Sequence, residues 1–470
     1  MQLTLDKAAP LEARVAARLD AHLSRDDPRP LALALSGGGD SLALLDLASA
    51  WARRNGRRVL ALTVDHGLNP AGADWSRFAA QTAHAAGADW RGLEWTGDKL
   101  ETGLPAAARL ARHRLIAEAA RAAGARVVLF AHTADDIAEA DWMRARGSTL
   151  GRLRDWSPSP VWPEGRGLML LRPLLDISRA ALRDHLRARG LDWIEDPANH
   201  DPRFARSRAR ASLSLLPLGE GGSRSETDEG SADGQSDTAD PHPPTRCASG
   251  PLSLSMGEGT LSLPRSANIH TLAAALVCAG GGAATPRGRR LARLLARLED
   301  PAPFTATLAG ARLEAAHDRL TLTRDPGEFA RRPRLPLPLP VAVPTVWDGR
   351  YEITAVEPGR SVVPAAGRLA ALAPPERAAL KSLPPVARAS LPVLIRDGGA
   401  APVLAWRAAE VRSLVAMRLA MALDQTPHEA DLDPALYGAT PWNALFSRAT
   451  DQGSAQPSAA PNDRGPNEPA

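Results

Sequence analysis

The first 210 residues alternate between short apolar runs and longer segments in which apolar positions recur every three or four residues. This recurrence is typical of amphipathic helices, notably at residues 105–123 and 178–190. The short runs have the length and composition of buried strands and lie at residues 31–35, 58–64, 90–95, 126–131 and 168–171. Strands that alternate with helices predict an α/β fold with a doubly wound parallel sheet.

The pattern changes after this region. Residues 219–251 contain no Leu, Ile, Val or Phe, so they cannot bury enough apolar surface to offset the entropy of ordering. Further on, the sequence predicts helices at 272–277 and 289–298 and strands at 305–308 and 320–323. We expect an α/β domain at residues 1–215, a disordered insertion at 216–265 and a helical domain with small strands at 266–332. A proline-rich linker is expected at 333–342, a small α+β domain at 343–430 and a disordered tail at 451–470.

The composition limits the possible partners and sites but does not assign a function. The 470 residues carry a formal net charge of only +4, and all but three of the 57 basic residues are arginine. Arginine suits phosphate contacts, so an RNA partner is compatible with this bias. The two cysteines, Cys247 and Cys278, are too few and too far apart for a disulfide framework or a zinc site.

The chain also lacks the sequence signals of membrane insertion or secretion. No apolar run approaches the length of a membrane span, and the first thirty residues carry charges in a helical pattern instead of the apolar core of a signal peptide. We therefore expect a cytoplasmic protein with no membrane partner.

A glycine-rich loop separates the first predicted strand from the first predicted helix. It consists of Ser36-Gly37-Gly38-Gly39-Asp40-Ser41. Glycines let the backbone approach an anion, and the start of a helix offers unpaired N–H groups. Asp40 can hold a magnesium ion between phosphate oxygens. The loop lacks the lysine of a Walker A motif, so the pattern predicts another kind of phosphate-binding loop. A purely structural turn is the alternative.

A second group of polar residues follows the fourth predicted strand. His132 ends that strand, Asp136 opens a helix, and Glu139 lies one turn later on the same face. These carboxylates could coordinate magnesium or orient an amine. Helix capping by Asp135 is the structural alternative.

Other basic residues are expected near the same edge of the sheet. Arg109 and Arg112 share one helix face and could neutralise phosphate charge in a transition state, unless they form only a solvated basic face. His66 follows the second predicted strand, where it could contact adenine or cap the sheet.

Several segments together resemble the tRNA(Ile)-lysidine synthases of the PP-loop superfamily, whose fold is that of the adenine nucleotide alpha hydrolases. The resemblance covers roughly residues 30–215. The glycine loop at residues 36–41 is common to the superfamily, whereas the segments at 172–175 and 193–199 are distinctive for the family. The matching segments are residues 36–41, 64–69, 131–139, 146–148, 172–175 and 193–199.

The resemblance implies an ATP-dependent ligase that forms a carbon–nitrogen bond. In that family ATP adenylates the C2 oxygen of the wobble cytidine of an isoleucine tRNA with a CAU anticodon. The ε-amine of L-lysine then displaces AMP to leave lysidine, and pyrophosphate is the other product. For this sequence the resemblance implies catalytic roles for Asp40, Asp136, Glu139 and Arg109, and Mg²⁺ contacts by Asp40 and Asp136. It implies ATP contacts by Ser36, Gly37, Gly38, Gly39, Asp40, Ser41, His66 and His132. It also implies tRNA contacts by Arg206, Arg208 and Arg210.

The sequence disfavours three alternative functions. A tRNA thiolase would use the same adenylation, but sulfur relay usually needs cysteines near the site, and residues 1–246 contain none. The segment at 193–199 argues against an enzyme that amidates small molecules. A catalytically inactive tRNA-binding module is disfavoured because Ser36, Asp40, Asp136 and Glu139 are all present.

The composition of the insertion generates a first prediction. Deleting residues 219–251 should leave folding and ATP turnover nearly unchanged, because a segment without large apolar residues contributes little to a core. Thermal unfolding and tRNA-dependent AMP formation measure the two properties. A deletion variant that is folded but inactive would show that the segment is functional.

Overall fold

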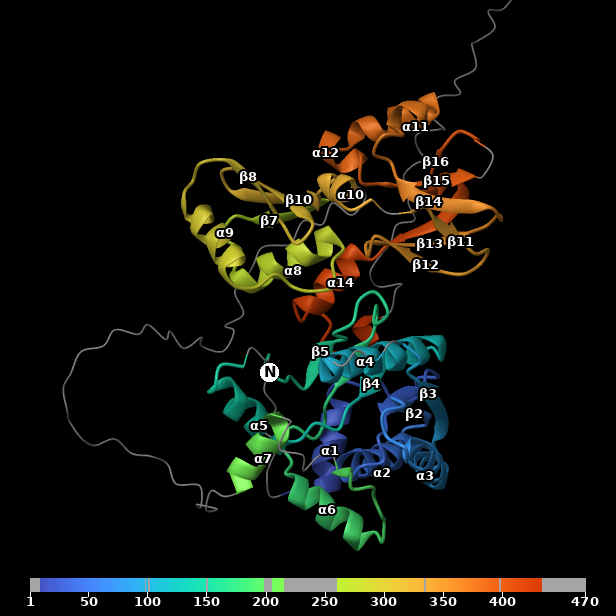
Figure 1. The fold of residues 1–470 in the computed structure, drawn as a ribbon, viewed down its shortest axis with the longest axis vertical. Helices are drawn as coiled ribbons and strands as arrows, with labels where there is room; N and C mark the ends of the chain where they lie inside the picture. The colour runs from blue at the N-terminus through green and yellow to red at the C-terminus, as the bar shows by residue number, and fades with distance from the viewer. Residues whose placement is uncertain are drawn as a thin grey trace, which may run out of the picture. The chain divides into compact units, whose positions relative to one another are not determined.

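The computed structural model describes residues 9–97, 99, 102–148, 151–197, 205–214, 260–333, 335–396 and 399–432. They form two compact units (Figure 1). The first contains the described residues up to 214 together with 420–432, and the second contains residues 260–419. No helix among the described residues is both long enough and apolar enough to cross a membrane.

The first unit is built on a six-stranded sheet of order β3-β2-β1-β4-β6-β5. All neighbouring strands pair in parallel except β5, which runs antiparallel to β6 at one edge. The strands are β1 (Leu31–Ala34), β2 (Val59–Asp65), β3 (Asp89–Glu94), β4 (Val127–Leu129), β5 (Trp156–Pro158) and β6 (Met169–Leu171). The parallel α/β sheet predicted from the alternating pattern is confirmed, although β5 was not predicted.

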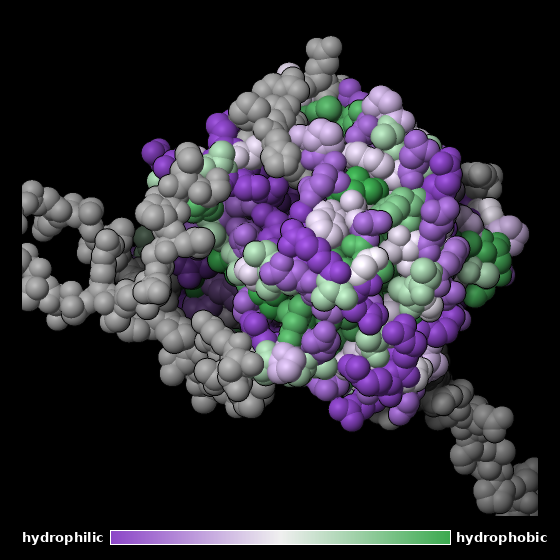
Figure 2. All heavy atoms as spheres, turned by 90° about the horizontal axis from the view of Figure 1, so that it is seen from below, coloured by the Kyte–Doolittle hydropathy of each residue, from purple (hydrophilic) through white to green (hydrophobic). Residues whose placement is uncertain are grey.

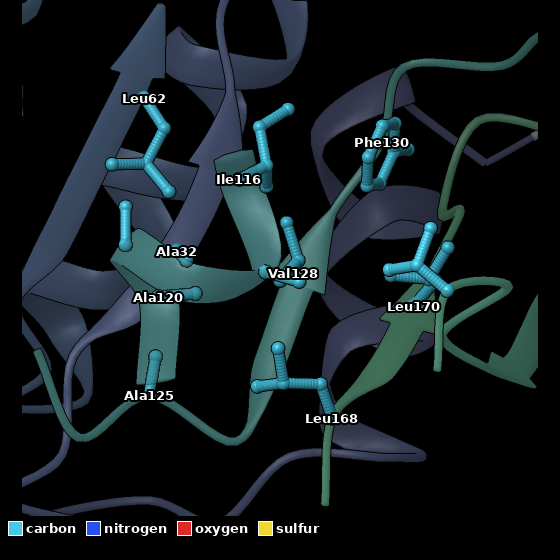
Figure 3. Close-up of a cluster of buried hydrophobic side chains, with 12 residues drawn as sticks. Ala32, Leu62, Ile116, Ala120, Ala125, Val128, Phe130, Leu168 and Leu170 are labelled. Carbon is cyan, nitrogen blue, oxygen red and sulfur yellow. The ribbon is translucent and has the colours of Figure 1, made fainter. Parts of the chain in front are cut away.

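Helices cover this sheet and supply its core. Ile116 and Ala120 of α4 pack against Ala32 of β1, Leu62 of β2 and Val128 of β4 (Figure 3). Burial of each large aliphatic side chain stabilises the unit by about 1.5–3 kcal/mol. The helices of the unit are α1 (Leu11–Asp20), α2 (Gly39–Arg54), α3 (Gly72–Ala85), α4 (Leu104–Ala122), α5 (Ala134–Arg144), α6 (Arg179–Ala188) and α7 (Ala205–Ser214).

The strand order determines where a ligand can bind. The chain moves from β1 outward through β2 to β3, and then returns to the other side of β1 with β4. Ligands of such sheets bind beyond the carboxyl ends of the strands where the order reverses. The glycine loop follows β1 and His132 follows β4, so both lie at this point.

The second unit contains three antiparallel sheets, of orders β7-β10-β9-β8, β11-β14-β15-β16 and β12-β13-β17. Its strands are β7 (Thr260–Pro264), β8 (Phe304–Leu308), β9 (Ala311–Ala315), β10 (Arg319–Arg324), β11 (Leu337–Leu339), β12 (Thr345–Trp347), β13 (Tyr351–Ala355), β14 (Arg360–Pro364), β15 (Pro392–Arg396), β16 (Val403–Leu404) and β17 (Ala409–Ser413). Its helices are α8 (Ile269–Gly280), α9 (Arg289–Glu299), α10 (Gly327–Arg331), α11 (Pro374–Ala379), α12 (Pro385–Arg388) and α13 (Ala405–Ala408). A further helix, α14 (Val415–Ala422), continues into the first unit.

Three boundaries expected from the sequence need correction. The predicted end of the insertion, residue 265, is too late, because residues 260–264 form β7 and pair with β10. The linker expected at 333–342 contains β11, an edge strand in which a proline is tolerated. The small domain expected at 343–430 also ends too late, because residues 420–432 pack with the first unit. Residues 215–259 and the tail at 451–470 lie outside the described residues.

A buried ion cluster joins two sheets of the second unit. Asp348, in the turn between β12 and β13, accepts hydrogen bonds at 2.9 Å from both Nε and Nη2 of Arg324 on β10. Arg350 Nε donates to the same carboxylate at 2.8 Å. All three residues are buried, so the two cations depend on this one carboxylate.

Removing that carboxylate should therefore destabilise the second unit strongly. We expect Asp348→Ala to lower the free energy of unfolding by about 3–5 kcal/mol, the usual result of leaving buried charge uncompensated. Glu314→Ala is the matched control, because Glu314 pairs with Arg312 on an exposed part of β9, where a pair contributes up to about 1 kcal/mol. Urea unfolding measures both, and equal losses would contradict the role assigned to Asp348.

Candidate active site

The glycine loop holds its shape through its own hydrogen bonds. Ser41 Oγ donates to the Gly38 carbonyl oxygen at 2.8 Å, and the hydroxyl oxygens of Ser36 and Ser41 are 3.1 Å apart. Gly38 is the N-cap of α2, and no described side chain caps this helix. The first N–H groups of α2 therefore keep the capacity to bind an anion.

The segment that follows α6 packs against the back of this loop. Ile194 N donates to the Gly37 carbonyl oxygen at 2.9 Å. Gly37 has a φ of +83°, and a Cβ atom there would lie 2.7 Å from Ile194 Cδ1. The left-handed backbone conformation therefore favours glycine at position 37, and a Cβ atom there would also displace the tip of the Ile194 side chain. The segment at 193–199 thus supports the glycine loop, as far as residue 197, where the described part ends.

One arginine joins the carboxylates of the site. Arg179, the first residue of α6, donates from Nε to Asp40 Oδ2 at 3.0 Å and from Nη1 to Glu139 Oε1 at 3.2 Å. Its Nη2 lies 3.8 Å from Asp136 Oδ1, and its backbone N–H donates to Asp135 Oδ2 at 2.7 Å. Burial acts to lower the pKa of Arg179, but the surrounding carboxylates raise it above its ordinary value.

The carboxylates differ in how fully they are paired. Asp136 Oδ2 accepts hydrogen bonds from the backbone N–H and the hydroxyl of Thr133, which makes Asp136 part of a capping box at the start of α5. Within the described residues, Asp40 Oδ1 and Glu139 Oε2 are buried without a hydrogen-bond partner. Burial raises the pKa of Asp40, although Arg179 opposes that shift. Two buried carboxylate oxygens without donors are a site that favours a cation.

A group of arginines lies close enough to Asp136 for their charges to interact. Burial, together with the charge of Arg206, lowers the pKa of Arg109. Burial and the neighbouring Arg109 lower the pKa of Arg112 to about 10, and Arg112 Nε is buried without a partner among the described residues. Desolvated cations that repel one another gain most from a bound anion, so this group favours phosphate.

Two histidines follow β2 and β4 at the same edge of the sheet. His132 is buried, and its Nδ1 accepts a hydrogen bond from Arg172 Nε at 3.2 Å. Burial and the charge of Arg172 hold the pKa of His132 well below its ordinary value. His66 lies edge-on to Trp95, and burial also lowers its pKa. Both rings are therefore neutral at pH 7 and suit contacts with a base or a ribose rather than with phosphate charge.

The sequence placed most of these residues correctly at one sheet edge but missed Arg179 and Arg172. Arg172 belongs to a segment that matched the family, yet no role was assigned to it. The three arginines expected along a tRNA path differ in their contacts and in their exposure. Arg210 Nε donates to Glu139 Oε1 at 2.9 Å, Arg206 Nη1 lies 3.9 Å from Asp136 Oδ1, and Arg208 is exposed.

The site suits a metal ion only together with a substrate. Among the described residues, no group of three or more His, Cys, Asp or Glu side chains could hold a metal by itself. Asp40, with its unpartnered Oδ1, is close enough to Asp136 for their charges to interact. Magnesium is commonly held by one or two carboxylates plus substrate phosphates, so these residues fit that arrangement.

Comparisons with known proteins agree with this geometry. The PP-loop domain family matches residues 11–216. The chain is 45% identical to the tRNA(Ile)-lysidine synthase of Caulobacter vibrioides, over 89% of this chain and 98% of the relative. It is 38% identical to the tRNA(Ile)-lysidine synthase of Mesorhizobium japonicum, over 73% of this chain and 76% of the relative.

Among solved structures, the U34-tRNA thiolase NcsA of Methanococcus maripaludis matches 43% of this chain and 72% of its own, with 19% identity and a TM-score of 0.36. A likeness of that size carries no argument about this chain.

The pairing of Arg179 with Asp40 generates a prediction about stability and pH. Because the pKa of Asp40 is raised in the folded state, proton binding by Asp40 favours the fold at low pH, and this contribution is lost as the pH rises through the raised pKa. Arg179→Gln removes the cation that offsets ionised Asp40. It should lower the free energy of unfolding by about 3 kcal/mol near neutral pH, and by less as the pH falls toward the ordinary pKa of Asp.

Arg187→Gln is the control on the same helix. Arg187 pairs with Asp184, and their side chains are 64% and 74% exposed, so we expect a loss below about 1 kcal/mol with little pH dependence. Denaturant unfolding at several pH values measures both variants. A loss for Arg179→Gln that does not change with pH would contradict the pairing.

Proposed function

This chain belongs to the tRNA(Ile)-lysidine synthase family, and on that premise we propose which residues perform its reaction. The chain is an ATP-using ligase that forms a carbon–nitrogen bond in tRNA. We infer that it joins L-lysine to C2 of the wobble cytidine of an isoleucine tRNA with a CAU anticodon. The products are lysidine, AMP and pyrophosphate. A tRNA substrate implies that the reaction takes place in the cytoplasm.

The observation that carries this assignment is the position of Asp40, Asp136 and Glu139 around Arg179, directly beside a phosphate-binding loop. Adenylation requires an electropositive surface for the phosphates of ATP. Attack by lysine requires a carboxylate that receives the ammonium group. The site offers both on adjoining elements.

In the first step the backbone N–H groups of residues 36–41 hold the phosphates, and Arg109 and Arg112 face the charge that develops on pyrophosphate. His66 and His132 contact the nucleoside part of ATP. Asp40 and Asp136 would hold Mg²⁺, which neutralises charge on the departing pyrophosphate when it is bound. The unpartnered Oδ1 of Asp40 supports this role.

In the second step Glu139 receives the ε-ammonium group of lysine and accepts the proton that must leave before the amine attacks C2. Its buried, unpartnered Oε2 supports this role. Arg210 and Arg179 both contact the other oxygen, Oε1, so they orient the carboxylate. AMP departs as the new carbon–nitrogen bond forms.

Recognition of tRNA involves arginines of α7 in this proposal. The exposed position of Arg208 and the partly exposed position of Arg206 suit phosphate contacts. Arg210 is tied to Glu139 and therefore acts at the lysine end of the site instead.

The thiolase alternative gains no support from the described cysteine. Cys278 lies in α8 of the second unit and is buried, and burial raises the pKa of its thiol to about 11. Such a thiol is a poor nucleophile at neutral pH. Cys247 lies outside the described residues.

The product formed on tRNA tests the proposal. Wild-type protein should need tRNA, ATP, Mg²⁺ and lysine together to convert the wobble cytidine into a lysine adduct, detected by mass spectrometry of the nucleosides. Asp40→Asn should lower AMP and pyrophosphate formation at least ~10²-fold, because it removes a charge that holds the metal ion while keeping the shape of the side chain. Binding of tRNA should persist.

Two results would contradict the proposal. One is full activity of Asp40→Asn. The other is productive replacement of lysine by a sulfur donor, which would favour the thiolase reaction.

A further inference from the structure

The chain returns to its first unit after completing the second. Residues 424–432, which we name the C-terminal strap, begin at Asp424 with a φ of +58° and end in the 3₁₀ turn Glu429–Leu432. Asp tolerates this left-handed conformation better than most residues, so the chain can reverse sharply after α14.

A buried ion pair anchors the strap. Glu429 Oε2 and Oε1 accept hydrogen bonds from Arg57 Nη1 and Nη2 at 2.9 and 3.0 Å, and both side chains are fully buried. The Ser24 N–H also donates to Glu429 Oε2, at 3.2 Å, and Glu429 N donates to the His22 carbonyl oxygen at 2.7 Å. A two-point pair with these additional hydrogen bonds fixes both position and orientation.

From this anchor the strap contacts residues 154 and 156, at the start of β5. Trp156 Nε1 donates to the Thr426 carbonyl oxygen at 2.6 Å. The Trp156 ring stacks on His22 with centroids 4.9 Å apart, and His22 Nδ1 donates to the Pro427 carbonyl oxygen at 2.7 Å. Arg154 forms an ion pair with Asp424 at the start of the strap. Residues on both sides of Asp155 are therefore held by the strap.

Residues 154–157, just before and within β5, position Arg172. Arg172 N donates to the Asp155 carbonyl oxygen at 2.8 Å. Its Nη1 donates to the Arg154 carbonyl oxygen at 2.7 Å and to Ser157 Oγ at 2.9 Å. With these atoms fixed, Arg172 Nε points at His132 Nδ1. Since Nδ1 accepts this hydrogen bond, the proton of the neutral imidazole resides on Nε2.

We propose that the C-terminal strap is a positioning element for the reaction. By holding residues 154–156 it aims Arg172, and Arg172 keeps His132 in the tautomer that leaves an Nε2–H donor for contact with ATP. This inference rests on the proposed function, in which His132 contacts ATP. A strap that served only stability would leave the His132 ring unaffected.

The test uses two tryptophans of the full-length protein. Trp156→Phe removes the N–H that donates to Thr426 and keeps an aromatic ring to stack on His22. Trp51→Phe is the matched control, because Trp51 is also buried and its Nε1 donates to Asp20 Oδ1 at 2.9 Å, between α2 and α1. Each variant loses one indole hydrogen bond, so their losses in thermal stability should be similar.

Two measurements distinguish a positioning role of the strap from a purely stabilising one. Nitrogen-15 NMR of histidine-labelled protein reports the tautomer of each ring, with the His132 signals assigned by their loss in His132→Gln. Wild type and Trp51→Phe should show His132 protonated on Nε2, whereas Trp156→Phe should show a mixture of tautomers. The kcat for tRNA-dependent AMP formation should fall roughly tenfold in Trp156→Phe, with the KM for tRNA unchanged and no change in Trp51→Phe.

The inference is overturned by a wild-type His132 spectrum in Trp156→Phe, by unchanged kcat in that variant, or by equal effects in the two variants. The NMR measurement needs no substrate, so it tests the link from the strap to His132 even if lysine were not the true substrate. Failure of wild-type protein to form the lysine adduct would instead refute the proposed function.

Discussion

Negative charge gathered at one edge of the sheet is the constraint on which the rest of the site depends. Asp40 at the start of α2, and Asp136 and Glu139 on α5, converge because β1 and β4 are neighbours in the sheet. Two like charges 4 Å apart repel by about 4 kcal/mol at an effective dielectric constant of 20. Arg179 contacts all three carboxylates and offsets this repulsion. The first turn of α6 is therefore part of the site as much as the glycine loop is.

This constraint gives the site two halves of opposite electrostatic character. Around Arg179 the carboxylates are paired, yet Asp40 and Glu139 each keep one buried oxygen without a donor among the described residues. In the other half, burial lowers the pKa of both Arg109 and Arg112. The first half gains from a cation and the second from an anion. A reaction that joins an amine to a phosphate-activated base uses both halves.

Local patterns in the sequence predicted the sheet, the position of the glycine loop and the position of the carboxylates, because a strand followed by glycines and a helix start has a local physical signature. Arg179 has no such signature. It is one of many arginines, and its role arises only when α6 packs beside α2. The strap is hidden for the same reason, since Arg57 and Glu429 are 372 positions apart. Strands as short as β5, three residues long with a proline at the end, also give little periodic signal.

We propose that Asp40 serves ATP cleavage while Glu139 serves the lysine amine. Exchange of labelled pyrophosphate into ATP, measured with tRNA and without lysine, tests this division most directly because it reports adenylation alone. Glu139→Gln keeps the size of the side chain and removes its charge. The account predicts that this variant retains tRNA-dependent exchange close to that of the wild type while failing to form the lysine adduct. Loss of exchange in Glu139→Gln would contradict the account, since Glu139 would then act in the adenylation step.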